Sequence, residues 1–182
     1  ISLKAQAKNL IFDIDVDNSL PVHLYGDDIR IRQILTNLLS NAIKYTKEGR
    51  VELSVKGEIK DNTVTLYCSV TDTGIGIKEE HLTNLFEEYK RIEDGSNHHI
   101  EGTGLGLNIT MRLLNLMGSK LQVQSEYGKG SKFFFELKQL VTDSMTIADY
   151  NKQQKQNQNH KQRICAFTAP TAKLSTLLWR QT

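Results

Sequence analysis

The chain has 182 residues, of which 38% are hydrophobic and 24% charged, and its formal net charge is +2. These values are ordinary for a folded globular domain with a core, and the near balance of charge excludes a strongly basic surface for nucleic acid or an anionic membrane. No apolar run approaches the roughly 18 residues that a membrane helix needs.

The first residue is Ile1, so we expect the chain to be a piece of a longer protein. Cys68 lies in an alternating apolar run and Cys165 in a polar stretch, with neither disulfide nor metal-ligand spacing. This usage predicts a reducing, cytoplasmic setting. Whether the full-length protein is anchored in the inner or plasma membrane stays open.

The first third of the chain predicts a short helix over residues 1–8, a half-exposed strand over residues 10–16 and a short strand over residues 22–25. Asp27 can cap a long helix that ends near Thr46. Apolar residues three and four apart form one stripe on that helix: Ile31, Ile34, Leu35, Leu38, Leu39 and Ala42.

Residues 51–59 and 63–71 alternate with period two around a turn at Asp61 and Asn62, which predicts a β-hairpin. Residues 78–86 have a short helical pattern. Residues 88–102 are polar with weak periodicity and predict a mobile loop.

Residues 103–117 predict a second amphipathic helix, closed by Gly118, and residues 121–125 and 131–140 a last pair of strands. Residues 152–162 are rich in Gln, Asn and Lys, so we expect a polar linker there. This order of elements predicts an α+β two-layer sandwich, in which about three helices cover one face of a mixed, mostly antiparallel sheet.

Four polar residues share one face of the long helix, because Asn37, Asn41, Lys44 and Tyr45 fall at positions i, i+4, i+7 and i+8. Amide oxygens suit a hard cation such as Mg²⁺, an ammonium group suits phosphate, and a phenol ring can lie against an aromatic base. Each residue alone is as well explained as a solvated helix residue.

A glycine-rich loop, Asp-Thr-Gly-Ile-Gly-Ile over residues 72–77, follows the second hairpin strand. A buried carboxylate at Asp72 must find a donor, and the exocyclic amine of adenine is one. Gly74 and Gly76 allow close backbone approach. The alternative is a tight turn in which Asp72 accepts from its own backbone.

A second loop, Gly-Thr-Gly-Leu-Gly-Leu over residues 102–107, opens a helix, where free N–H groups can bind an anion. Its spacing is not the dinucleotide-binding fingerprint, and the chain has no Gly-Lys-Ser/Thr phosphate loop. The alternative reading is a flexible hinge.

In combination, these motifs resemble the ATP-binding catalytic domain of sensor histidine kinases, in the superfamily that includes gyrase B and the heat-shock chaperone and mismatch-repair ATPases. The resemblance covers roughly residues 10–140. It implies a Bergerat-type ATP-binding fold at residues 9–141, preceded by the end of a linker helix at 1–8. Residues 142–182 would be a polar linker or tail, and residues 167–173 resemble the linker into a receiver domain of hybrid kinases.

The resemblance also implies roles for individual residues. Asp72 would accept from the adenine amine, Tyr45 would pack on the base, and Lys44 and Arg91 would contact phosphate. Asn37 and Asn41 would hold Mg²⁺. Residues 86–89 resemble the phenylalanine box, with Glu88 where the family often has proline, and residues 88–101 the ATP lid. Further nucleotide contacts would come from Gly74, Gly76, Ile77, Phe86, Gly102, Thr103, Gly104, Leu105, Gly106, Leu107 and Ser131.

A phosphoacceptor histidine is expected on a separate dimerisation domain, because the family's acceptor context of acid, Arg and Pro surrounds none of His23, His81, His98, His99 and His160. A response regulator or receiver domain would follow in the pathway. The isolated domain is expected to be a monomer and the full-length protein a homodimer, with no nucleic-acid partner.

Two alternatives remain beside the kinase. The hydrolysing ATPases of the superfamily carry a general-base Glu four residues before the helix asparagine, but that position here is Asn37, an amide that cannot take a proton. A nucleotide-binding interaction module without phosphoryl transfer is the third reading, against which the intact Asn, Asp and Gly positions argue.

Overall fold

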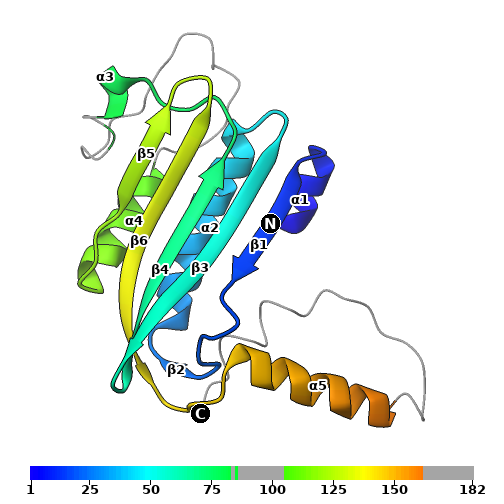
Figure 1. Cartoon of the computed structure of the whole chain (residues 1–182). Coiled ribbons are helices and arrows are strands. Elements are labelled where there is room, and N and C mark those ends of the chain that lie inside the picture. Colours follow the sequence, from blue (N-terminus) through cyan, green and yellow to red (C-terminus); the bar gives the residue numbers. More distant parts are fainter. Residues whose placement is uncertain (83–84, 86–104, 162–182) are drawn as a thin grey trace. The chain divides into compact units, whose positions relative to one another are not determined.

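The computed structural model describes residues 1–82, 85 and 105–161, without the side chains of residues 105 and 155–161. A six-stranded sheet has the order β1-β3-β4-β6-β2, with β5 paired to β6 (Figure 1). The strands are β1 (Ile11–Val16), β2 (Leu24–Tyr25), β3 (Arg50–Lys60), β4 (Thr63–Asp72), β5 (Gln122–Glu126) and β6 (Gly130–Val141). The helices are α1 (Ser2–Ala7), α2 (Asp28–Tyr45), α3 (Glu79–Leu82), α4 (Leu105–Leu116) and α5 (Ile147–Lys161).

The sheet is mixed. Strands β5 and β2 both pair with β6 in antiparallel fashion. The N–H of Ile11 donates to the carbonyl of Gly49 over 2.9 Å, so β1 starts beside the start of β3 and runs in the same direction (Figure 1). The predicted α+β class with a mixed sheet is therefore confirmed.

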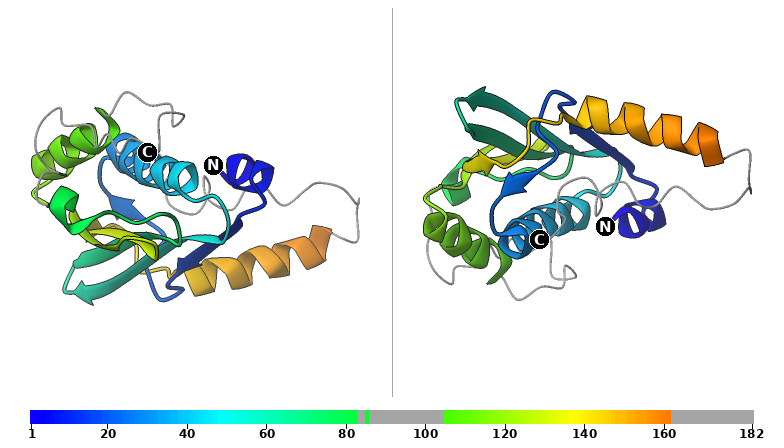
Figure 2. Two further views of the ribbon diagram at one scale, coloured as in Figure 1. Left: turned by 90° about the horizontal axis from the view of Figure 1, so that it is seen from above. Right: turned by 90° about the horizontal axis from the view of Figure 1, so that it is seen from below.

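The chain divides into two compact units. Unit 1 comprises residues 1–15, 29–55 and 67–137, and unit 2 comprises residues 16–28, 56–66 and 138–182, so several strands contribute to both. In unit 1, α2 and α4 lie along one face of the sheet (Figure 2).

The core of unit 1 forms where this helical face meets the sheet. The predicted stripe of α2 is buried at five positions, Leu35 being only half-buried, and Ile43 joins it. Buried side chains that project from the sheet and from α4 include Val51, Leu53, Cys68, Val70, Leu114, Phe135 and Leu137. Burial raises the pKa of the Cys68 thiol to about 12, so this group stays protonated and unreactive.

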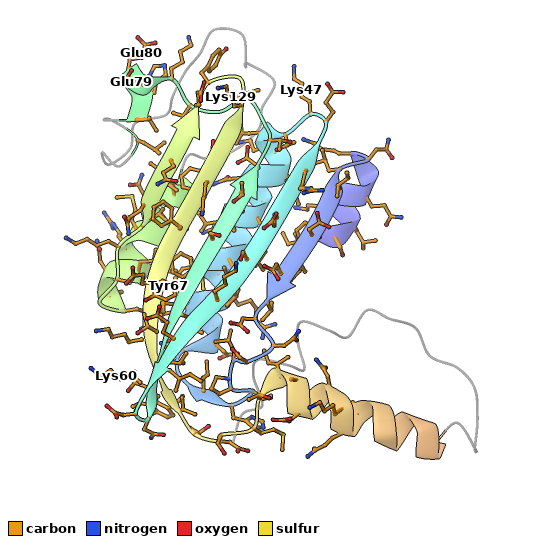
Figure 3. All side chains as sticks on the ribbon, in the orientation of Figure 1. Lys47, Lys60, Tyr67, Glu79, Glu80 and Lys129 are labelled. Carbon is orange, nitrogen blue, oxygen red and sulfur yellow. The ribbon has the colours of Figure 1, made fainter. Side chains whose placement is uncertain are left out.

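Tyr67 marks the opposite face of β4. Its side chain is 37% exposed, and Figure 3 shows it in front of the sheet, whereas α2 runs behind. The period-two alternation of the strand therefore sends odd-numbered residues away from the helices and even-numbered ones towards them.

Unit 2 contains β2, paired with the end of β6 through Leu24 opposite Val141 and Tyr25 opposite Leu140. Its buried hydrophobic residues include Leu20, Val22, Val64, Leu66 and Ile147. Within the described ranges, no helix combines the length and the apolar character that crossing a bilayer requires.

Helix α5 occupies most of the segment that was expected to be a polar linker. Its start is fixed by a cap: the Thr146 hydroxyl donates to Asp149 over 2.7 Å and accepts from the Asp149 N–H over 3.2 Å. Ile147, which is 4% exposed, anchors the first turn, and its N–H donates to Leu20. Composition did not indicate this helix, because a lack of apolar residues says how little surface the segment can bury and not that Gln and Lys favour the helical backbone.

Candidate functional site

All described residues of the candidate site belong to unit 1. On α2, the predicted polar stripe lies beside the buried apolar stripe. Asn37, Asn41 and Lys44 are half-buried, and Tyr45 is 39% exposed. Helical spacing therefore brings these four residues to one face, at the border between core and solvent.

Asn37 also contacts α4. Its Nδ2 donates to the carbonyl of Gly106 over 3.3 Å and to the hydroxyl of Thr110 over 3.5 Å. Thr110 is fully buried. These bonds join the middle of α2 to the first turns of α4 and use the amide nitrogen of Asn37. Its carbonyl oxygen is the atom that can serve as a cation ligand.

Asp72 is the buried carboxylate of the site. It continues the even-numbered, helix-facing series of β4, which explains why the side chain is only 7% exposed. The N–H of Gly74 donates to its Oδ1 over 2.9 Å, and the N–H of Ser131 donates to the same carboxylate. Burial raises the pKa of Asp72, and these two hydrogen bonds oppose that rise. The local turn that the sequence left as an alternative is therefore present, and it holds a buried acceptor.

The loop after Asp72 rests on the β5–β6 turn. Gly76 has a φ of +65°, and a Cβ at this position would collide with the backbone carbonyl of Glu126. The N–H of Gly128 donates to the carbonyl of Ile75 over 2.8 Å. A glycine at position 76 is thus required both by the left-handed backbone and by the close approach of two chains.

Ser125 is a member of the site that sequence reasoning missed. Its hydroxyl accepts from the N–H of Ile77 over 2.8 Å and donates to the carbonyl of Gly130 over 2.9 Å. It also lies 2.9 Å from the hydroxyl of Ser131, whose N–H reaches Asp72. A serine in a strand gives no sequence signal of such a role, because its partners come from two other segments.

Lys44 and Tyr45 contact each other. The Lys44 ammonium lies 4.8 Å from the centroid of the Tyr45 ring and donates to its hydroxyl over 3.3 Å. A cation over a ring face stabilises both side chains modestly. The pair leaves the positive charge and the ring on the same part of the helix surface.

The second glycine loop is described only from its end onward. Leu105 begins α4, and Gly106 and Leu107 are half-buried in its first turn. The other candidates in this region lie outside the described residues: Phe86, Arg91, Gly102, Thr103, Gly104 and the predicted lid at residues 88–101.

A divalent cation at this site would need ligands from the side-chain amides of α2 and from a bound polyphosphate. The described residues contain no group of three or more His, Cys, Asp and Glu side chains able to hold a metal. Mg²⁺ accepts few protein ligands when phosphate oxygens and waters complete its shell, so the carbonyl oxygens of Asn37 and Asn41 fit this cation only together with a polyphosphate.

A family model and known proteins match most of this chain. The family model described as histidine kinase-, DNA gyrase B-, and HSP90-like ATPase matches residues 26–141. "Hybrid signal transduction histidine kinase B" of Dictyostelium discoideum is 44% identical over 138 residues, which are 75% of this chain and 7% of that protein.

Two solved structures share the fold. The full-length ShkA structure in complex with AMPPNP has a TM-score of 0.63 and 32% identity, covering 79% of this chain and 29% of that one. The nucleotide-free catalytic domain of histidine kinase ThkA has a TM-score of 0.57 and 27% identity, covering 75% and 83%. This chain thus corresponds to a small part of the curated relative and to most of an isolated catalytic domain. It belongs to the family of histidine kinase-, DNA gyrase B-, and HSP90-like ATPases.

Proposed function

We propose that this chain binds Mg-ATP and donates its γ-phosphate to a histidine on a separate dimerisation domain, as the catalytic part of a two-component signalling kinase. The observation that carries the proposal is Asp72, a buried carboxylate held by the N–H groups of Gly74 and Ser131. An ionised carboxylate can accept more hydrogen bonds than these two, so its remaining lone pairs can accept from the exocyclic amine of a bound base.

The remaining described residues suit the rest of the nucleotide. Tyr45 offers a ring for the base, and Lys44 a positive charge for phosphate. The carbonyl oxygens of Asn37 and Asn41 would hold Mg²⁺, which neutralises phosphate charge when bound. Arg91 and residues 102–104 are proposed to complete the phosphate contacts. Phosphoryl transfer depends mainly on such positioning and charge neutralisation.

Transfer rather than hydrolysis is favoured by Asn37. An amide has no basic site to accept a proton from water, and this amide nitrogen already donates to Gly106 and Thr110. We therefore expect slow ATP turnover by the chain alone. In the transfer, an imidazole nitrogen attacks the γ-phosphorus, the bond to the bridging oxygen breaks, and the imidazole loses its proton as ADP leaves.

The partners and cellular setting are part of the proposal. The names of the similar proteins are those of sensor and hybrid histidine kinases, which supports a phosphoacceptor domain upstream and a receiver or response regulator downstream. A cytoplasmic location of this domain, a monomeric isolated domain and a homodimeric full-length protein are proposed with it.

Calorimetric titration with a non-hydrolysable ATP analogue tests the binding step. We expect Mg²⁺-dependent binding that Asp72→Ala weakens about tenfold or more, since hydrogen bonds to charged groups contribute about 1.5–3 kcal/mol. Asp15→Ala, at an exposed carboxylate on β1, is the matched control and should bind normally. Unchanged affinity in Asp72→Ala would contradict the proposed site.

The transfer step needs a second assay. Mixing the chain with ATP and a separately expressed dimerisation domain that carries the acceptor histidine should give an acid-labile phosphoprotein. Rapid phosphate release by the chain alone would instead favour a hydrolysing ATPase, and binding without either product would favour a nucleotide-responsive interaction module.

A further inference from the structure

The last turn of α2, which carries Lys44 and Tyr45, is closed by a lysine from outside the helix. Lys8 lies just after α1, and its ammonium nitrogen donates to three backbone carbonyls at the end of α2. The acceptors are Ile43 at 2.7 Å, Lys44 at 3.0 Å and Thr46 at 3.3 Å. An ammonium group has three N–H donors, so its full capacity is used.

The remaining carbonyls of the turn have partners as well. The N–H and hydroxyl of Thr46 both donate to Ala42, over 3.1 and 2.7 Å. The carbonyl of Tyr45 accepts from the N–H of Ile75 over 3.3 Å. The last carbonyls of a helix normally have no partner within it. Here Lys8 donates to two of them, on Ile43 and Lys44, and to the carbonyl of Thr46, the residue after the helix. The glycine loop at residues 72–77 donates to the carbonyl of Tyr45, which lies between them.

The Tyr45 carbonyl is thus a point of contact between the helix end and the glycine loop. A Cβ on Gly74 would lie 2.5 Å from this oxygen, so the two backbones touch. The same Gly74 donates to Asp72 over 2.9 Å. Any change in the direction of the Tyr45 carbonyl therefore reaches the group that orients the Asp72 carboxylate.

Lys8 is itself held in place. Its N–H donates to Ala5, and the N–H of Leu10 reaches back to the same carbonyl over 3.0 Å. Ala5 is 1% exposed and Leu10 7%, which seats α1 and the start of β1 in the core of unit 1. The charge also lies at the negative end of the α2 dipole, where a cation is favoured.

We propose that Lys8 is a positioning residue for the nucleotide site. By binding the carbonyls on either side of Tyr45, it fixes the helix end against which the loop at residues 72–77 is built, and it makes nucleotide affinity depend on α1. The expected effect on ATP affinity rests on the proposed function. The expected effect on the Tyr45–Ile75 hydrogen bond does not depend on it.

The variant Lys8→Met keeps the aliphatic stem and removes the donors. In the nucleotide-free chain we expect faster hydrogen exchange of the Ile75 and Gly74 amides, with unchanged exchange in the core strands β3 and β4. A lysine that only stabilised the fold would speed exchange in all of these together. Lys4→Met, an exposed lysine of α1, is the matched control and should leave Ile75 unaffected.

Titration with the ATP analogue and Mg²⁺ measures the effect of Lys8 on nucleotide affinity. We expect the Kd of Lys8→Met to rise about two- to fivefold, as for loss of a charge at a helix terminus, and Lys8→Arg to restore part of it because the guanidinium keeps charge and donors. If the parent chain bound no analogue, the proposed function would fail, and exchange at Ile75 would still decide the role of Lys8. Exchange at Ile75 equal to that of Lys4→Met would overturn the inference.

Discussion

The amide nitrogen of Asn37 donates to the carbonyl of Gly106, 3.3 Å away and 69 residues later in the chain. This bond orients the Asn37 side chain, because the nitrogen faces α4 and the oxygen is left for another partner. Helix α2 and the start of α4 are therefore joined through Asn37, which is also a candidate Mg²⁺ ligand.

Replacing Asn37 by Ala should reduce the Mg²⁺-dependent part of nucleotide affinity. The change removes one cation ligand and the two bonds to α4, whose loss should cost about 0.5–1.5 kcal/mol each in stability at most. Titrations with and without Mg²⁺ measure the effect. Gln33→Ala, an exposed amide one turn earlier on α2, is the control and should behave as the parent chain does. If Mg²⁺ raised nucleotide affinity by the same factor in the parent chain and in Asn37→Ala, Asn37 would not be a ligand of the cation.

Nucleotide affinity should fall at acid pH because of Asp72. Burial raises the pKa of this carboxyl above its ordinary value of 3.8, and an amine donor binds the ionised form. Protonation of the free chain therefore competes with binding, and the loss should begin at a higher pH than for an ordinary aspartate. The variant Asp72→Asn should bind at least about tenfold more weakly at neutral pH and lack this acid-side fall.

The same shift has a consequence for stability, with a defined sign. A carboxyl whose folded-state pKa is raised favours folding most below pH 3.8, and this contribution is lost as pH rises through the raised pKa. Asp72→Asn should therefore unfold, at neutral pH, at a denaturant concentration no lower than the parent chain. A clear loss of stability in the variant would contradict the raised pKa, because it would mean that the folded state favours the ionised carboxylate of Asp72.

Ser125→Ala should loosen the first glycine loop. The change leaves the N–H of Ile77 and the carbonyl of Gly130 without this hydroxyl, and we expect a cost of about 1–3 kcal/mol in the free energy of unfolding. Weaker nucleotide binding should accompany it, because Ser131, the neighbour of Ser125, donates to Asp72. Chemical denaturation and titration measure the two effects. Ser69→Ala, on the sheet face away from the helices, is the control expected to change neither.

Gly76 and Gly118 allow a direct test of the close approach at the glycine loop. Both have left-handed backbones, with φ of +65° and +71°, but a Cβ at Gly76 meets the Glu126 carbonyl, whereas at Gly118 it meets nothing within 4 Å. Gly118→Ala should cost about 1 kcal/mol from backbone strain alone. Gly76→Ala should cost distinctly more and also weaken nucleotide binding. Equal losses of stability would argue that the loop can move away from β5 freely.

Much of the candidate site could be predicted because its signals are local. Helical spacing alone places Asn37, Asn41, Lys44 and Tyr45 on one face. Strand alternation likewise makes Asp72 a buried, helix-facing residue, as the structure shows. The long helix, the hairpin and the last strand pair were predicted for the same reason, since a period of 3.6 or 2 is written in neighbouring residues.

The segment at residues 152–162 stays a predicted linker, but its composition did not indicate that the described part is helical. Composition reports how much apolar surface a segment can bury, but not whether a cap and one anchor start a helix. The cap between Thr146 and Asp149 was readable from the sequence, whereas the burial of Ile147 within unit 2 was not.

What the sequence by itself determined is the set of residue types at the site and the face of each element that carries them, because backbone periodicity acts over a few residues. Only the tertiary structure decided which segments complete that site. Lys8 reaches Ile43 across 35 residues, and Ser125 meets Ile77 across 48. No local sequence pattern around a lysine or serine predicts such a distant partner, because these hydrogen bonds form only after the sheet and helices have packed.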